Sequence, residues 1–68
     1  MLDARGLSCP LPVLMVQQEL KKTAPAELTA LVDARVAVEN ITRCAHTLGY
    51  DIAVEPRGGE FVLTLRKR

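Results

Sequence analysis

The sequence is poor in the residues on which several functions depend. It has one Phe, one Tyr and no Trp, which are too few aromatic rings to form a stacking platform for nucleic-acid bases. Nine Lys and Arg residues against eight Asp and Glu residues give a formal net charge of +1, too small to indicate a dedicated nucleic-acid binder. We therefore expect no direct contact with nucleic acid.

Metal sites and the usual catalytic constellations are also missing. The one histidine, His46, has no second histidine and no cysteine pair at ligand spacing to complete a metal site. The sequence contains no Ser-His-Asp set, no paired-carboxylate signature and no glycine loop that could cradle phosphate. We expect neither a metal nor a cofactor.

The chain has no long apolar run. A membrane-spanning helix needs roughly 20 apolar residues, and no run in this sequence approaches that length. No secretory signal precedes the domain, so we expect no membrane association and a reducing, cytoplasmic location. In that compartment a structural disulfide between Cys9 and Cys44 is not expected. The 68 residues predict one small domain, residues 1–68.

The spacing of apolar residues predicts the order strand, helix, strand, helix, strand, strand. The predicted elements are a strand over residues 1–4, a helix over 10–22, a strand over 27–32, a helix over 34–48, and strands over 50–55 and 61–65, the last two joined by a turn at 56–59. Asp33 is expected to cap the second helix, and Gly49 to end it in the left-handed conformation. Right-handed crossovers then place both helices on one face of a four-stranded mixed sheet, an α/β (α+β) two-layer sandwich.

The stretch around Cys9 predicts a tight turn that delivers a cysteine to the start of a helix. Gly6 provides the backbone freedom for the bend, and Pro10 suits the first helical position, where an N–H has no intrahelical partner. Cys9 then occupies the N-cap at the positive end of the helix dipole, which favours thiolate over thiol. Pro12 removes one N–H, so Leu11 is the obvious backbone donor to the sulfur. Taken alone, the same pattern fits a rigid helix start with an incidental cysteine.

Two large apolar side chains close to Cys9 are predicted to be exposed. The face of the first helix that should pack on the sheet carries Val13, Val16, Gln17 and Leu20. Leu11 and Met15, one turn apart, fall nearly opposite that face. An apolar pair beside a reactive group indicates a docking patch for partner proteins, and a methionine adapts its shape to several partners.

The second cysteine, Cys44, has different surroundings. It falls on the apolar stripe of the second predicted helix. A buried cysteine in such a stripe behaves as a small hydrophobe, so we expect no role for Cys44 as a resolving thiol.

The residues around Cys9 resemble the N-terminal signature of the TusA/SirA-like small sulfur carriers, which is centred on a C-P-x-P motif. In this chain the signature runs from Asp3 to Leu14. Further matches follow in the same order at Val32-Asp33, Val38–Ile41, Gly49-Tyr50, Phe61–Leu63 and Arg66-Lys67. The segment from Glu39 to Tyr50 is similar to the YedF-like branch. The resemblance implies a sheet in the order 1-2-4-3 with the last strand antiparallel.

The resemblance also implies a function and a site. Cys9 would carry a terminal sulfur as a persulfide, as a sulfurtransferase-type carrier rather than a stand-alone enzyme. A cysteine desulfurase or a rhodanese-like donor would supply the sulfur. An acceptor protein would receive it for tRNA thiolation, cofactor assembly, or sulfur or selenium metabolism. The loop that presents the sulfur would comprise Asp3, Arg5, Gly6, Leu7, Pro10 and Pro12.

Asp3 and Arg5 allow two interpretations. In the first, Arg5 adds positive charge near the sulfur while Asp3 orients the guanidinium. In the second, the two form a surface ion pair, which contributes about 0–1 kcal/mol to stability and has only a minor structural role at the end of the strand. The family match favours a structural role in fixing the loop.

Two other functions fit the same residues. In the first, the chain is a regulatory binding module that uses the Leu11 and Met15 patch, with Cys9 structural. In the second, it is a redox sensor in which Cys9 cycles through sulfenic acid or a disulfide. The sensor normally needs a nearby resolving cysteine, which a buried Cys44 does not supply.

Overall fold

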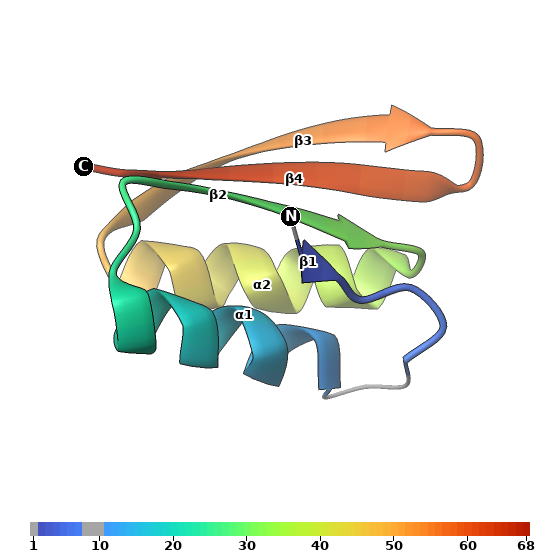
Figure 1. Ribbon diagram of the computed structural model, residues 1–68. Coiled ribbons are helices and arrows are strands. Elements are labelled where there is room, and N and C mark those ends of the chain that lie inside the picture. The colour runs from blue at the N-terminus through green and yellow to red at the C-terminus, as the bar shows by residue number, and fades with distance from the viewer. Residues whose placement is uncertain (1, 8–10) are drawn as a thin grey trace.

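A computed structural model describes residues 2–7 and 11–68 of the chain. These residues form two helices and a four-stranded sheet in the order βαβαββ (Figure 1). The elements are β1 (Leu2–Asp3), α1 (Leu11–Thr23), β2 (Glu27–Val32), α2 (Arg35–Thr47), β3 (Tyr50–Arg57) and β4 (Glu60–Lys67). The predicted element order is therefore confirmed, and the second strand has the predicted bounds.

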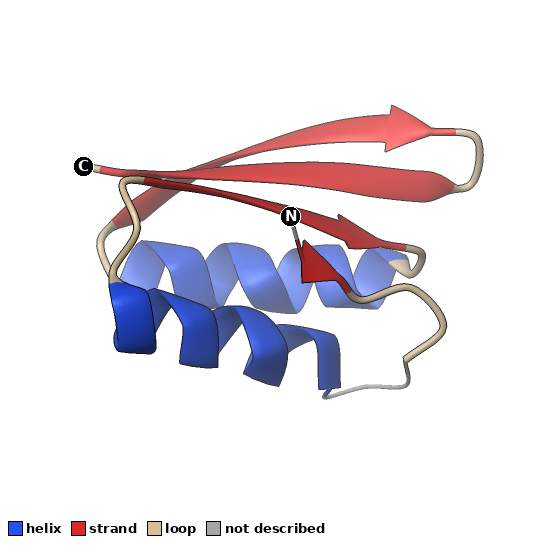
Figure 2. Ribbon diagram, viewed as in Figure 1, coloured by secondary structure: helices blue, strands red, loops and turns tan. Residues whose placement is uncertain are grey.

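The sheet has the strand order β1-β2-β4-β3, as the family resemblance implied. β1 pairs in parallel with β2, while β4 runs antiparallel to both β2 and β3. Figure 2 shows α1 and α2 side by side on one face of the sheet. The two-layer α+β architecture expected from right-handed crossovers is confirmed.

The core lies between the sheet and the helix layer. Side chains alternate between the two faces of each strand, so every second strand residue points towards the helices. In the observed register Ala30 lies opposite Leu63, and both are fully buried. The buried apolar side chains are Ala4, Val16, Leu20, Ala30, Val32, Ala37, Val38, Ile41, Ala45, Tyr50, Leu63 and Leu65.

Two connections follow the sequence signals, and one is tighter than expected. Ala24, at φ +44°, and Pro25 end the first helical run, and Gly49, at φ +85°, ends the second. The turn between β3 and β4 is confined to Gly58 and Gly59, whereas the sequence predicted a turn over residues 56–59. Pro56 remains in β3, where it pairs with Phe61. An edge strand such as β3 tolerates a proline, because its outward N–H positions need no ladder partner.

The expected helix cap at Asp33 is wrong. Ala34 occupies the N-cap position of α2, and no side chain donates or accepts a cap hydrogen bond there. The Asp33 carboxylate instead accepts a hydrogen bond from the Gly6 N–H. This side chain therefore makes a tertiary contact with a residue 27 positions away in the sequence.

A search of the helices in the described part of the chain finds none that is long and apolar enough to cross a membrane.

Tyr50 ties the first residue of β3 to the connection that precedes β2. Its ring is buried, and its hydroxyl donates a hydrogen bond to the Pro25 carbonyl oxygen at 2.7 Å. This contact closes the end of the core opposite the start of α1 (Figure 1).

Tyr50→Phe should lower the free energy of unfolding by about 1 kcal/mol, because it removes the donor to the Pro25 carbonyl and keeps the buried ring. Urea unfolding followed by circular dichroism at neutral pH measures the difference. An unfolding free energy equal to that of the wild type would show that water replaces the hydroxyl at no cost.

Candidate functional site

The candidate site is the connection between β1 and α1, where the cysteine motif lies. The structure describes this connection up to Leu7 and again from Leu11. The predicted N-cap position of Cys9 and first-turn position of Pro10 lie outside the described residues, and both stay predictions. What the structure provides is the set of contacts that hold the chain on either side of them.

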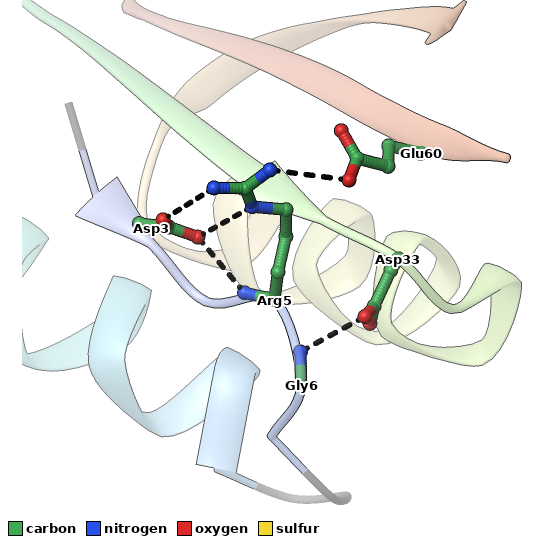
Figure 3. Close-up of polar contacts among 5 residues, drawn as sticks. All are labelled: Asp3, Arg5, Gly6, Asp33 and Glu60. Carbon is green, nitrogen blue, oxygen red and sulfur yellow. Dashed lines mark hydrogen bonds and ion pairs between the residues drawn. The ribbon is translucent and has the colours of Figure 1, made fainter. Parts of the chain in front are cut away.

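Backbone contacts hold the chain as it leaves β1. The Ala4 N–H donates to the Leu31 carbonyl oxygen at 2.8 Å, which continues the parallel ladder by one residue. The Gly6 N–H donates to Asp33 Oδ2 at 2.9 Å (Figure 3). The segment that precedes the cysteine is thus fixed to the end of β2 at two points.

Gly6 meets a backbone requirement at the bend. Its φ is +75°, in the left-handed region that L side chains rarely adopt. A Cβ built on Gly6 would have no heavy atom within 4 Å, so backbone conformation rather than lack of space requires the glycine. The next residue, Leu7, is half-buried and packs against the core. The bend and this apolar anchor together set the direction in which the chain leaves the sheet.

Asp3, Arg5 and Glu60 form a polar clamp beside this bend (Figure 3). Arg5 Nε and Nη2 donate to the two carboxylate oxygens of Asp3 at 2.9 and 2.8 Å, and the Arg5 backbone N–H donates to Asp3 Oδ1 at 3.2 Å. Arg5 Nη1 reaches Glu60 Oε2 at 3.1 Å. The guanidinium thereby joins the end of β1 to the first residue of β4.

The clamp changes the pKa values of its members. Hydrogen bonds from the Arg5 side chain and backbone, with its positive charge, lower the pKa of Asp3 from 3.8 to about 2. Hydrogen bonds to Asp3 and Glu60 raise the pKa of Arg5. The side chains keep exposed fractions of 55% for Asp3 and 43% for Arg5, so solvent and salt screen the attraction.

Sequence reasoning missed two residues of this arrangement, Asp33 and Glu60. Asp33 directly precedes the N-cap, Ala34, and the prediction that it caps α2 left its long-range partner unidentified. Glu60 is 55 residues from Arg5 in sequence. The one available signal was its position directly after a glycine turn, as the first residue of a strand in the same sheet as β1.

The exposed apolar residues of α1 differ from the prediction in one member. Leu11 is 46% exposed, as expected, but Met15 is half-buried and packs against the core. Leu14 is exposed instead, at 42%. The inward face of the helix includes Pro12 together with Val16, so this face lies closer to Met15 and farther from Leu14 than predicted.

A third exposed apolar residue lies at the same end of the helix layer. Both helices begin at the end of the molecule where the chain leaves β1 (Figure 1). Val36, in the first turn of α2, is 53% exposed. We call these three exposed residues near the starts of α1 and α2, Leu11, Leu14 and Val36, the apolar patch. Among the described residues, Val54 of β3 is the other large hydrophobic residue with comparable exposure.

Cys44 has the surroundings of a structural thiol. It is half-buried rather than fully buried as predicted. Burial raises the pKa of its thiol, and the nearby charge of Lys21 offsets the shift in part. A raised pKa lowers the thiolate fraction at neutral pH and makes the group a poor nucleophile. Within residues 2–7 and 11–68, no cluster of His, Cys, Asp and Glu side chains could hold a metal ion.

Comparison with known proteins identifies the family. The family model described as "Sulfurtransferase TusA" matches residues 1–67. This chain belongs to the TusA sulfurtransferase family. The assignment confirms the resemblance seen in the residues around Cys9.

A solved structure agrees with the TusA assignment. A SirA-like protein from Desulfitobacterium hafniense has 29% sequence identity to this chain and a TM-score of 0.83. The alignment covers 96% of this chain and 92% of that protein. A comparison with curated proteins gives no match. The family and the fold are therefore shown, and TusA-family proteins act as sulfur carriers.

Arg5→Gln should raise the pKa of Asp3 from about 2 towards its ordinary value of 3.8, because the charged donors are removed. The folded-state pKa of Asp3 lies below the unfolded one. The pair therefore stabilises the folded state above pH 4 or so, and this stabilisation is lost as the pH falls to about 2. An NMR titration of the Asp3 carboxyl carbon measures the shift in both proteins.

Glu60→Gln is the matched control, because it leaves both Arg5 side-chain bonds to Asp3 in place. It should move the Asp3 pKa less than Arg5→Gln does. An Asp3 pKa that is unchanged in Arg5→Gln would contradict the clamp.

Proposed function

We propose that this TusA-family chain carries sulfur as a persulfide on Cys9 and passes it from a donor protein to an acceptor protein. The family assignment over residues 1–67, together with the C-P-x-P motif at Cys9, carries this proposal. The contacts of Ala4, Gly6 and Leu7 support it, because they anchor the chain directly before the motif.

The proposed chemistry is thiol exchange without net oxidation. The Cys9 thiolate attacks the outer sulfur of a donor persulfide, the donor S–S bond breaks, and the donor cysteine leaves as a thiolate. An acceptor thiolate then attacks the outer sulfur on Cys9, and Cys9 leaves as a thiolate. Each step forms one S–S bond and breaks one, so no oxidant or reductant is consumed.

The predicted position of Cys9 suits both steps. The 13-residue helix α1 follows it, and the positive end of a helix dipole stabilises an anion at its N-terminus. The same interaction favours the Cys9 thiolate as nucleophile and as leaving group, and it favours the persulfide anion as cargo.

The donor is proposed to be a cysteine desulfurase or a rhodanese-like protein in the cytoplasm. The acceptor would serve tRNA thiolation, cofactor assembly, or sulfur or selenium metabolism. Both partners must approach Cys9 closely enough for sulfur exchange and then leave. We propose that they contact the apolar patch, in which Leu14 replaces the predicted Met15.

Incubation with a cysteine desulfurase, pyridoxal phosphate and cysteine should add one sulfur, about 32 Da, to Cys9. Intact-protein mass spectrometry measures the gain, and a reductant wash should remove it. Cys9→Ser should abolish the gain, whereas Cys44→Ser should retain it. Sulfur on both cysteines would indicate non-specific sulfuration, and no gain with this donor or a rhodanese would contradict the carrier.

Leu11→Asp and Leu14→Asp should each lower the rate of sulfur transfer from the desulfurase by roughly tenfold, because a buried carboxylate opposes docking. Val54→Asp is the matched control, because Val54 has similar exposure but lies on β3. Equal rates in the three variants and the wild type would exclude the patch as a docking site.

The exposed patch also favours a second candidate, a regulatory binding module in which Cys9 is structural. This function predicts that Cys9→Ser retains partner binding and activity, while Leu11→Asp abolishes both. The carrier predicts loss of sulfur transfer in Cys9→Ser with partner binding retained.

A further inference from the structure

Asp33 makes a long-range contact with Gly6 next to a helix that has no side-chain cap. Asp33 directly follows β2 and precedes Ala34, the N-cap of α2. A capping carboxylate typically stabilises a helix, yet α2 begins without a side-chain cap. The carboxylate is directed instead at a backbone N–H of the cysteine-bearing connection (Figure 3).

The side chain of Asp33 provides a hydrogen-bond acceptor beyond the point where the β1–β2 ladder ends. β1 pairs with β2 through Leu2 and Asp3, and the Ala4 N–H adds a bond to the Leu31 carbonyl. Beyond this point β2 turns into α2, so its backbone no longer runs beside the outgoing chain. The Asp33 carboxylate supplies an acceptor at that position and extends the hold on the chain by two residues, to Gly6.

Gly6 is the last residue before Cys9 that a described hydrogen bond fixes. Cys9 follows three residues later in the sequence. The φ of +75° at Gly6 sets the direction of the chain towards Cys9. A change in the orientation of the Gly6 peptide would therefore change the direction in which the chain continues towards Cys9.

We propose that Asp33 is a positioning residue for sulfur transfer, which places Cys9 through its hydrogen bond to the Gly6 N–H. The proposal rests on the proposed function of Cys9 as a carrier, and it adds a residue from outside the motif. Within the described residues no cation pairs with Asp33, so the contact consists of a carboxylate and a neutral donor. Its acceptor oxygen, and not its charge, is what the proposal requires.

The variants separate the hydrogen bond from the charge and from general stability. Asp33→Ala removes the acceptor, Asp33→Asn keeps an acceptor oxygen without the charge, and Asp33→Glu keeps the charge but moves the oxygens by one methylene. The matched control is Asp51→Ala, which removes an exposed aspartate bonded to Arg68 at 2.7 Å on the β3 side of the sheet. All are made in a Cys44→Ser background, so that Cys9 is the one reactive thiol.

Two measurements report on Cys9 itself. The first is the rate constant for sulfur transfer from a cysteine desulfurase, followed by intact mass. The second is the pH profile of Cys9 alkylation by iodoacetamide, which reports the thiolate fraction without any partner protein. Urea unfolding of each variant accompanies both.

Asp33→Ala and Asp33→Glu should slow sulfur transfer on the order of tenfold, because small displacements of a reacting group reduce rates strongly. Their alkylation profiles should move to higher pH, because a displaced Cys9 would lose the predicted stabilisation of its thiolate by the helix dipole. Asp33→Asn and Asp51→Ala should stay within about twofold of the background protein in transfer rate, with an unmoved profile. The rescue by asparagine identifies the hydrogen bond as the cause.

Three outcomes would overturn the proposal. Wild-type transfer and alkylation in Asp33→Ala would show that the contact does not position Cys9. A loss in Asp33→Asn equal to that in Asp33→Ala would assign the effect to charge. Lowered stability with an unmoved alkylation profile would assign Asp33 a structural role only. Failure of the background protein to load would contradict the carrier function, while the alkylation profile would still test the position of Cys9.

Discussion

The shortness of β1 is the constraint on which the site depends. This strand contributes two residues to the sheet, paired with Ala30 and Leu31 of β2. So short a strand cannot by itself fix the direction of the chain that leaves it. The outgoing segment is held by side chains from other parts of the sequence, Asp33 after β2 and Glu60 at the start of β4. Side chains from outside the connection therefore hold its described part, residues 4–7.

This arrangement divides the surroundings of the cysteine motif into two kinds of surface. On the sheet side, carboxylates and one guanidinium hold the backbone, and their hydrogen-bonding capacity is used within the chain. On the helix side, the apolar patch exposes side chains to solvent at the N-terminal ends of α1 and α2. A carrier that must meet several partners needs a fixed reactive group and a surface that releases each partner. In the proposed function, the internal polar contacts would serve the first requirement and the exposed apolar residues the second.

The fold was predictable because local patterns and long-range packing agree along most of the chain. The mostly apolar run in Glu27–Val32 predicted a strand and Gly49 predicted the end of a helix, and the structure has both. The role of Asp33 could not be assigned, because an aspartate between a strand and a helix predicts a helix cap. Its actual partner, Gly6, becomes a neighbour only through the pairing of β1 with β2. Met15 was predicted to be exposed, but it is half-buried. The inward face of α1 includes Pro12, and Leu14 is the exposed residue instead.

The misassigned Asp33 is informative about how a small domain divides its interactions. A core of this size supplies roughly 3–5 kcal/mol, so a helix cap typically worth about 1 kcal/mol is a substantial part of the stability. A capping side chain at the N-cap position would stabilise α2, but that position holds Ala34. Here the carboxylate holds Gly6, on the one connection that bears the motif cysteine, and α2 begins without it. The conflict between a local rule and the observed contact therefore falls on the connection that bears the motif, where the proposal places a positioning role for Asp33.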